Sequence, residues 1–360
     1  MPSWPGAFGD CVPSSCAGQE RRTPARVAGK RSMHVPERVI AQGRAVLPRS
    51  GRGPALLAGE RGSKAMTMTT DPPPLAIRVV GRTAAVSPLR YPGGKAALAG
   101  FFGQIIGRLG IRSATYVEPY AGGAGAGIAL LRQGMVQQLV VNDVDPAVYC
   151  FWLAVTGQSQ QFAARIVDTP LDVEEWRRQK QIYRAADESD PLTLGFAFFY
   201  LNRTNRSGIL NAGPIGGVNQ NGRYKIDARF NRDQLAERVA AIGALAVRIT
   251  VLSLDGMSVA QRFIADPSAF VYIDPPYVDM GSSLYLNAFT HRDHADLATK
   301  LDEQPDGNWV VTYDPSDFIR RLYRQHEIRE YQLSYSAHRT GKASELMVTS
   351  RPVSRLLACG

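Results

Sequence analysis

The sequence predicts an α/β protein built on a parallel sheet that is interrupted by an inserted, mainly helical segment. From Ser87 onward, short runs rich in β-branched residues alternate with helical stretches. Such alternation is typical of parallel strands joined by crossover helices. A polar stretch rich in Arg and Asn, residues 151–244, interrupts the alternation before strands resume. The sequence contains no regularly repeated segment of the kind that marks a repeat protein.

Each expected element follows from a local apolar pattern. The expected strands cover residues 114–118, 139–143, 249–254, 270–273 and 309–312, and a helix is expected over 127–134. The chain then divides into an N-terminal extension (1–75), a first part of the sheet domain (76–150), an insert (151–244) and a second part of the sheet domain (245–360).

The N-terminal extension carries most of the net charge. Residues 1–65 contain 11 Lys or Arg against 4 Asp or Glu, a net of +7 out of +10 for the whole chain. The extension is rich in Gly, Pro, Ser and Arg and lacks periodicity, which predicts disorder. Two interpretations stand: a basic arm that scans DNA, or a dispensable extension upstream of a natural start at Met66 or Met68. The remaining net charge of +3 supports a polyanionic partner only weakly.

Composition argues against several classes of protein. A hydrophobic fraction of 44% and a charged fraction of 21% are typical of soluble domains, and no apolar run approaches the roughly 20 residues that span a bilayer. The four cysteines form no C-x-x-C pair and have no paired histidines nearby, so no metal site is expected. The N-terminus lacks the pattern of a secretory signal. We therefore expect a cytoplasmic protein.

The strongest chemical signal follows the expected strand at 270–273. Asp274, Pro275, Pro276 and Tyr277 end this strand, and in a parallel sheet ligands bind beyond the carboxyl ends of the strands. The prolines fix the backbone, so that the Asp274 carboxylate and the Pro275 carbonyl present two acceptors beside a flat ring. This arrangement suits an amino group on an aromatic ring, whose hydrogens must be accepted before its nitrogen attacks a methyl donor. A strand-ending turn capped by Asp274 is the alternative.

Two glycine-rich segments suit a bound cofactor. The turn that contains Gly122 and Gly123 lets the backbone approach a ligand, but the dinucleotide fingerprint fails because Ile128 occupies its third glycine position. Asp143, after the next strand, suits the two hydroxyls of a ribose, or it caps the following helix. Lys95 follows two glycines without forming a P-loop. It suits the carboxylate of an amino-acid-bearing cofactor, or it is a solvated loop lysine.

Residues 89–95, 117–123 and 274–277 resemble, in order, the motifs of the Dam-type (D12 class) DNA adenine-N6 methyltransferases, and the resemblance runs from about 87 to 350. It implies a Rossmann-like methyltransferase sheet dependent on S-adenosylmethionine, with a mainly helical target-recognition domain between the second and third strands. It also implies that Asp274 to Tyr277 are catalytic. The residues implied to bind S-adenosylmethionine are Tyr91, Lys95, Glu118, Gly122, Asp143 and Asp255, the last near its adenine.

Polar side chains of the insert are the expected DNA contacts. Asn202, Arg203, Arg206, Ser207 and Asn211 offer hydrogen-bond donors for phosphates and base edges, and a solvated polar loop is the alternative. Arg206 and Asn211 stand where GATC-modifying relatives have an aromatic residue and a guanine-reading Arg, so GATC specificity is not carried over. Arg339 and Lys342, in an expected hairpin, are either phosphate contacts or part of an exposed basic turn.

The expected function is methyl transfer from S-adenosylmethionine to the N6 amino group of adenine in a specific duplex DNA sequence, after the base has flipped out of the helix. Two alternatives are a cytosine-N4 methyltransferase, whose target amine needs the same acceptors, and a catalytically inactive DNA-binding specificity subunit of the same fold. Cytosine-C5 chemistry is rejected because neither Cys150 nor Cys359 has the sequence context of its nucleophile. Expected partners are double-stranded DNA and, as an open alternative, a separate restriction endonuclease of a bacterial or phage-type system.

Overall fold

The computed structural model describes residues 86–90, 95–277, 289–335 and 341–358, with backbone alone for 333–335 and 341–343. The predicted extension 1–75 lies outside this range. The chain divides into two units, Met1–Met68 and Thr69–Gly360, and the second contains everything described below. Among the described residues, no helix is both long and apolar enough to cross a bilayer, and no group of three or more His, Cys, Asp or Glu is arranged to hold a metal ion.

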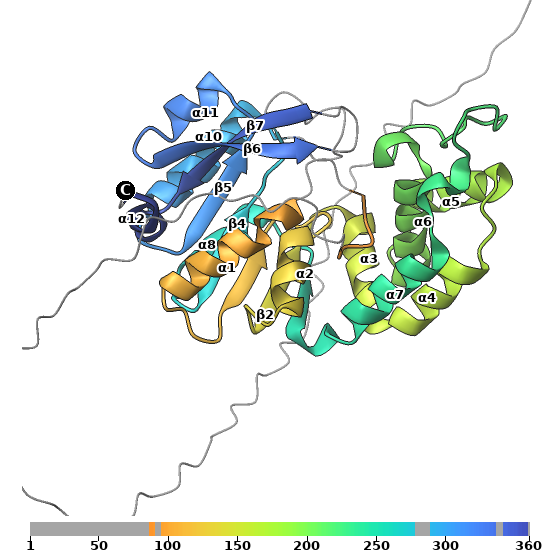
Figure 1. Cartoon of the computed structure of the whole chain (residues 1–360), viewed down its shortest axis with the longest axis horizontal. Helices are drawn as coiled ribbons and strands as arrows, with labels where there is room; N and C mark the ends of the chain where they lie inside the picture. Colours follow the sequence, from red (N-terminus) through yellow and green to blue (C-terminus); the bar gives the residue numbers. More distant parts are fainter. Residues whose placement is uncertain (1–85, 91–94, 278–288, 336–340, 359–360) are drawn as a thin grey trace, which may run out of the picture. The chain divides into compact units, whose positions relative to one another are not determined.

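A seven-stranded sheet organises the second unit, in the order β3-β2-β1-β4-β5-β7-β6 (Figure 1). The strands are β1 (Thr115–Glu118), β2 (Gln138–Asn142), β3 (Ile249–Leu252), β4 (Ala269–Ile273), β5 (Trp309–Tyr313), β6 (Glu327–Tyr335) and β7 (Gly341–Thr349). Neighbours among β1 to β5 pair in parallel, whereas β7 runs antiparallel to β5 and β6. The five strands expected in the parallel part are confirmed, and β6 and β7 form the expected hairpin. All five residues of β4 and of β5 are buried, which explains their unbroken apolar runs.

Helices pack on both faces of this sheet. Because successive strand residues point to opposite faces, Tyr116 of β1 belongs to one apolar core and Val117 to the other. The first core includes Phe102 of α1 and Leu130 of α2, and the second includes Leu297 of α10. The helical elements of the sheet domain are η1 (Lys95–Leu98), α1 (Ala99–Arg108), α2 (Gly125–Arg132), α8 (Gly256–Ile264), α10 (His291–Asp302), α11 (Asp317–Leu322) and α12 (Arg351–Ala358).

Between β2 and β3 the chain is helical. This stretch contains α3 (Pro146–Gly157), α4 (Ser159–Asp168), α5 (Val173–Ala185), α6 (Pro191–Thr204), η2 (Arg206–Gly208), η3 (Ile226–Arg229), α7 (Arg232–Gly243) and η4 (Ala246–Arg248). The rings of Phe151, Phe162 and Phe199 pack together in its interior. Helix α3 starts ahead of residue 151 because Asp145 caps it and Pro146 occupies its first position. The use of this region for target recognition stays a prediction.

Candidate active site

Four acidic residues stand at the carboxyl edge of the parallel strands. Glu118 ends β1, Asp143 follows β2, Asp255 follows β3 and Asp274 follows β4. Since these strands are neighbours and run in the same direction, their carboxyl ends form one edge of the sheet, which is where ligands bind in such folds. The sequence prediction of which loops face the site therefore agrees with the topology.

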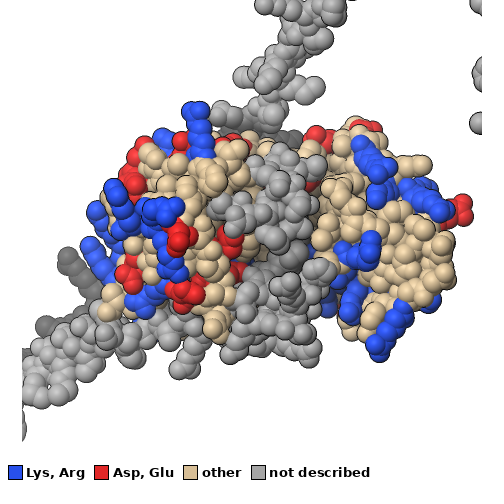
Figure 2. All heavy atoms as spheres, turned by 90° about the horizontal axis from the view of Figure 1, so that it is seen from above, with Lys and Arg blue, Asp and Glu red and all other residues tan. Residues whose placement is uncertain are grey.

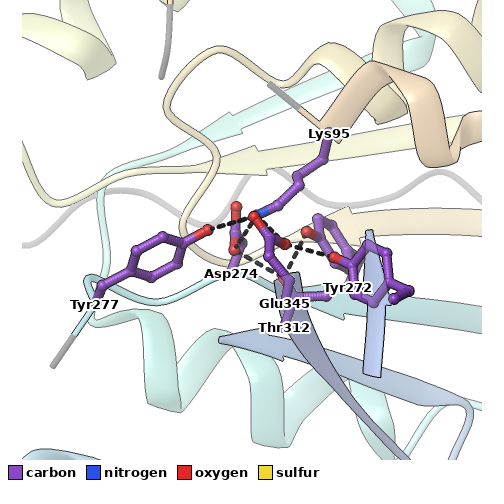
Figure 3. Close-up of polar contacts among 7 residues, drawn as sticks. Lys95, Tyr272, Asp274, Tyr277, Thr312 and Glu345 are labelled. Carbon is purple, nitrogen blue, oxygen red and sulfur yellow. Dashed lines mark hydrogen bonds and ion pairs between the residues drawn. The ribbon is translucent and has the colours of Figure 1, made fainter. Parts of the chain in front are cut away.

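Lys95 connects the Asp274–Tyr277 segment to the C-terminal hairpin (Figure 3). Its ammonium nitrogen lies 3.2 Å from Asp274 Oδ1 and 3.0 Å from Glu345 Oε2, and it donates to the Tyr277 hydroxyl at 2.6 Å. The Tyr277 hydroxyl in turn donates to Glu345 Oε1 at 3.2 Å. The side chains of Lys95 and Glu345 are only 6% and 2% exposed, against 26% for Asp274. Lys95 and Glu345 are therefore enclosed, whereas Asp274 and Tyr277 are partly open to solvent.

Two buried hydroxyls hold Asp274 from the sheet side. Thr312 of β5 donates to Asp274 Oδ1 at 2.8 Å, and the Tyr272 hydroxyl lies 2.7 Å from the Thr312 oxygen. Because the Thr312 hydroxyl hydrogen points at the Asp274 carboxylate, the Tyr272 hydroxyl is the donor in its contact with Thr312. Oδ1 thus accepts from both Thr312 and Lys95, whereas Oδ2 accepts no hydrogen bond within the described part of the chain. One carboxylate oxygen is fixed and the other is open to a ligand.

The surroundings of Asp274 favour its neutral form more than water does. Burial raises its pKa above the ordinary value, Lys95 and the Thr312 hydrogen bond oppose this rise, and the charge of Glu345 adds to it. The local group contains two carboxylates and one ammonium. A carboxyl with a raised pKa and one open oxygen is suited to accept hydrogen bonds from an amine and then a proton.

The glycine-rich turn after β1 is held by two carboxylates. Glu118 Oε1 accepts the Gly127 N–H at 2.8 Å, and burial raises the pKa of Glu118 to about 8. Asp143 Oδ2 accepts the Gly122 N–H at 2.9 Å, and burial raises the pKa of Asp143 to about 6. A Cβ at Gly127 would lie 2.9 Å from Glu118 Oε1, so only glycine allows this helix start to approach the carboxylate.

The loops after β1, β2 and β3 are joined by one buried amide. Asn142 donates to the carbonyls of Pro119 and Leu254 and accepts the Leu254 N–H at 2.9 Å. Asp255 follows directly, is exposed, and caps α8 by accepting the Ser258 N–H. Beside this loop the buried Tyr120 hydroxyl has no hydrogen-bond partner in the described structure. The glycine turn, the acidic loops and the unpartnered hydroxyl together suit a polar ligand at this edge.

The predicted DNA-contacting residues fall into two groups. Arg206 and Asn211 are exposed on the insert, and Arg203 is largely buried, with an Nε that has no partner among the described residues. Burial lowers the pKa of Arg203 to about 9, and Arg238, Arg90 and Arg229 contribute. On the face drawn in Figure 2, several Lys and Arg side chains and few acids lie over the insert. An arginine that pairs with no carboxylate in the described part of the chain, in arginine-rich surroundings, suits an anion.

Asn202 is a correction to the prediction of DNA contacts. It is 3% exposed, accepts the Arg90 N–H at 2.7 Å and donates to the Arg90 carbonyl at 2.8 Å. Its amide therefore holds the main chain of Arg90 and, being buried, is not exposed for a contact with DNA. Ser207 is partly buried, with a positive φ of 57° inside η2. Tyr91 and Arg339 lie outside the described residues, as does the side chain of Lys342.

Several residues of the site carry no local sequence signal. The sequence assigns no role to Thr312, Tyr331, Asn142 or Glu345. Thr312 is distinguished by its place near the carboxyl end of β5, next to β4, which is the one signal that identifies it in advance. The others depend on pairings distant in the sequence: the contact of Lys95 with Glu345 spans 250 positions.

The family model described as D12 class N6 adenine-specific DNA methyltransferase matches residues 91–337 of the chain. The Type II methyltransferase M.MjaIII of Methanocaldococcus jannaschii is 22% identical over 60% of this chain and 79% of the relative. The Type II methyltransferase M.CviBI of Paramecium bursaria Chlorella virus NC1A is 24% identical over 61% of this chain and 81% of the relative. The Retron Ec67 DNA adenine methylase of Escherichia coli is 25% identical over 65% and 82%.

Among solved structures, the rRNA methyltransferase aviRa of Streptomyces viridochromogenes aligns with a TM-score of 0.34 at 18% identity, over 78% of this chain and 93% of that one. This score is too low to support any conclusion. The family match, by contrast, spans well over half of the chain and includes the glycine-rich turn, the insert and the Asp274–Tyr277 segment. The chain therefore belongs to the D12 class of N6 adenine-specific DNA methyltransferases.

Proposed function

We propose that this protein transfers a methyl group from S-adenosylmethionine to the N6 nitrogen of an adenine that has been flipped out of a specific duplex DNA sequence. The observation that carries the proposal is the state of Asp274. Its Oδ1 is fixed by Thr312 and Lys95, while its Oδ2 is open at the carboxyl edge of the sheet. The Pro275 carbonyl and the Tyr277 ring follow on the same short segment.

The cofactor site lies along the strand ends. We assign Glu118, Gly122, Asp143 and Asp255 to S-adenosylmethionine, together with Tyr91 from outside the described range. Asp143 suits the ribose hydroxyls and Asp255 the adenine edge, beside the unpartnered Tyr120 hydroxyl. The cofactor, when bound, supplies an electrophilic methyl group. Lys95, which the resemblance assigns to the cofactor, is engaged with Asp274 and Glu345 in the free protein, so we place its main effect at the catalytic carboxylate.

The catalytic segment acts on the target amine. Asp274 Oδ2 and the Pro275 carbonyl accept its two hydrogens, which localises the nitrogen lone pair for attack, and Tyr277 stacks on the base. As the new N–C bond forms, the S–C bond of the methyl donor breaks, with its electron pair kept by sulfur, and N6 must lose one proton. Asp274 is placed to take it, and its raised pKa suits that task.

DNA binding is assigned to the insert. Arg203 and Arg206 are the proposed phosphate contacts, and Ser207 and Asn211 are proposed to face the bases, with Lys342 and Arg339 of the hairpin on the backbone. These contacts must offset the free-energy cost of base flipping, which is roughly a few kcal/mol. Because two relatives are named Type II methyltransferases, we include in the proposal a separate restriction endonuclease that reads the same sequence.

The test is methyl transfer from labelled S-adenosylmethionine to unmethylated DNA, followed by nucleoside analysis. The expected product is N6-methyladenine from the wild type and none from Asp274→Asn, which keeps the shape of the side chain but removes its charge. Cofactor binding by calorimetry should be retained in that variant. N4-methylcytosine as the product, or full activity of Asp274→Asn, would overturn the proposal.

A further inference from the structure

Glu345 is a buried carboxylate of the C-terminal hairpin whose two oxygens are both occupied. Oε1 accepts from the Tyr277 hydroxyl and from Lys95, each at 3.2 Å. Oε2 accepts from the Tyr331 hydroxyl at 2.6 Å and lies 3.0 Å from Lys95 Nζ. A buried charge with this many partners is fixed in place. Glu345 also lies beyond residues 91–337, which the family model matches.

The position of Glu345 separates it from the target site. It is 2% exposed and stands behind Lys95, whereas Asp274 is partly open to solvent (Figure 3). The next residue on β7, Leu346, belongs to the apolar core on the other face of the sheet, as strand alternation requires. Glu345 therefore has no surface to offer a substrate, and its contacts lead to the two ends of the catalytic segment, Asp274 and Tyr277.

We propose that Glu345 is a positioning residue for methyl transfer: it anchors Lys95 so that the ammonium joins the Asp274 carboxylate to the Tyr277 hydroxyl before DNA binds. This inference rests on the proposed function of Asp274 and Tyr277. Lys95 bridges two carboxylates, and its distances to Asp274 and Glu345 differ by only 0.2 Å (3.2 and 3.0 Å). Without the charge of Glu345, Asp274 is the one carboxylate left among the described partners of Lys95, so the ammonium is drawn toward the oxygens that the target amine needs.

The effect on charge has a definite sign. The negative charge of Glu345 raises the pKa of Asp274, whereas Lys95 lowers it. Removing the charge of Glu345 therefore lowers the pKa of Asp274 twice over, by direct loss of repulsion and by freeing Lys95 to pair with it. Because catalysis uses the ionised carboxylate, the acid limb of the rate profile moves to lower pH even as the maximal rate falls.

The test variant is Glu345→Gln, which keeps the shape and the acceptor for Tyr331 but removes the charge. We expect kcat to fall by about 10- to 100-fold, as a small misplacement of catalytic groups does. The KM for DNA and the affinity for S-adenosylmethionine should stay unchanged, and the acid limb should shift to lower pH. Glu330→Gln on neighbouring β6 is the matched control, because Glu330 is exposed and pairs with Arg320. It should leave kcat and the pH profile as in the wild type.

Two further measurements keep the inference testable. Tyr331→Phe removes a donor to Glu345 and should lower kcat in the same direction by a smaller factor, again without a change in KM. A carbon-13 NMR titration of the Asp274 carboxyl in the free protein should give a lower pKa in Glu345→Gln, whatever DNA is methylated. If the wild type methylates no DNA but the Asp274 pKa is still lower in Glu345→Gln, the proposed function is wrong and the anchoring of Lys95 by Glu345 stands. An unmoved Asp274 pKa, or lost stability with unchanged kcat, would refute the inference.

Discussion

Replacing Thr312 by Val removes one hydroxyl from the centre of the site while preserving the shape of the side chain. Thr312 is fully buried, donates to Asp274 Oδ1 at 2.8 Å and lies 2.7 Å from the Tyr272 hydroxyl. The Tyr272 hydroxyl is then left buried without a partner, which costs about 1–3 kcal/mol of unfolding free energy. Asp274 loses a hydrogen bond that favours its ionised form, worth about 1.5–3 kcal/mol for a charged acceptor.

The two effects have separate signatures. Since the Thr312 hydrogen bond lowers the pKa of Asp274, its loss raises that pKa, and the acid limb of kcat against pH moves to higher pH. This direction is opposite to the one expected for Glu345→Gln. Adding Tyr272→Phe to Thr312→Val removes the stranded hydroxyl, so the double variant should regain most of the lost stability but none of the lost activity.

Urea unfolding and a pH–rate profile measure these two effects. Thr250→Val, at an exposed position of β3, is the matched control and should change the free energy of unfolding by less than about 0.5 kcal/mol. The reasoning fails if Thr312→Val unfolds at the wild-type urea concentration, if the double variant is no more stable than the single one, or if the acid limb does not move.

Two other substitutions test the cofactor edge and the insert. Gly127→Ala places a Cβ 2.5 Å from a Leu139 methyl carbon and 2.9 Å from Glu118 Oε1, which should cost about 1–3 kcal/mol of stability and weaken S-adenosylmethionine binding in calorimetry. Gly107→Ala, where an added Cβ meets no atom within 4 Å, should instead stabilise, and equal losses in both would contradict the argument. Arg203→Met should leave stability unchanged or raised, yet lower DNA affinity. In anisotropy titrations, the slope of log affinity against log salt should weaken by about 0.9 per lost phosphate contact, and an unchanged slope would remove Arg203 from the interface.

The parallel sheet and its functional edge were predictable because they depend on local patterns. The apolar runs that became β4 and β5 are buried along their whole length, and a buried parallel strand needs no partner residue to be recognised. Once β1 to β4 are parallel neighbours, Glu118, Asp143 and Asp274 must lie at one edge. Most of the candidate site followed from this single rule.

The rest depended on contacts that no local pattern encodes. The polar run after Leu201 predicted DNA contacts, with a solvated loop as the alternative, but Asn202 and Asn205 are buried. Asn202 pairs with the Arg90 main chain, and Asn205 accepts the Trp176 indole N–H at 2.6 Å. A polar side chain that satisfies a distant backbone cannot be distinguished from a DNA-reading one in the sequence. The partners of Lys95 were hidden for the same reason, because Glu345 reaches it only through the antiparallel insertion of β7.

That insertion also sets the order in which the contacts around Lys95 can form during synthesis, because β7 is made after Lys95, Asp274 and Tyr277. Lys95, Asp274 and Tyr277 leave the ribosome well before β7, and β5 gains its second neighbour only when β7 enters between it and β6. Until then the nascent chain can form the contacts of Lys95 with Asp274 and Tyr277, but not its contact with Glu345. Under the proposed mechanism, the complete set of contacts around Lys95 therefore forms only once β7 has joined the sheet between β5 and β6.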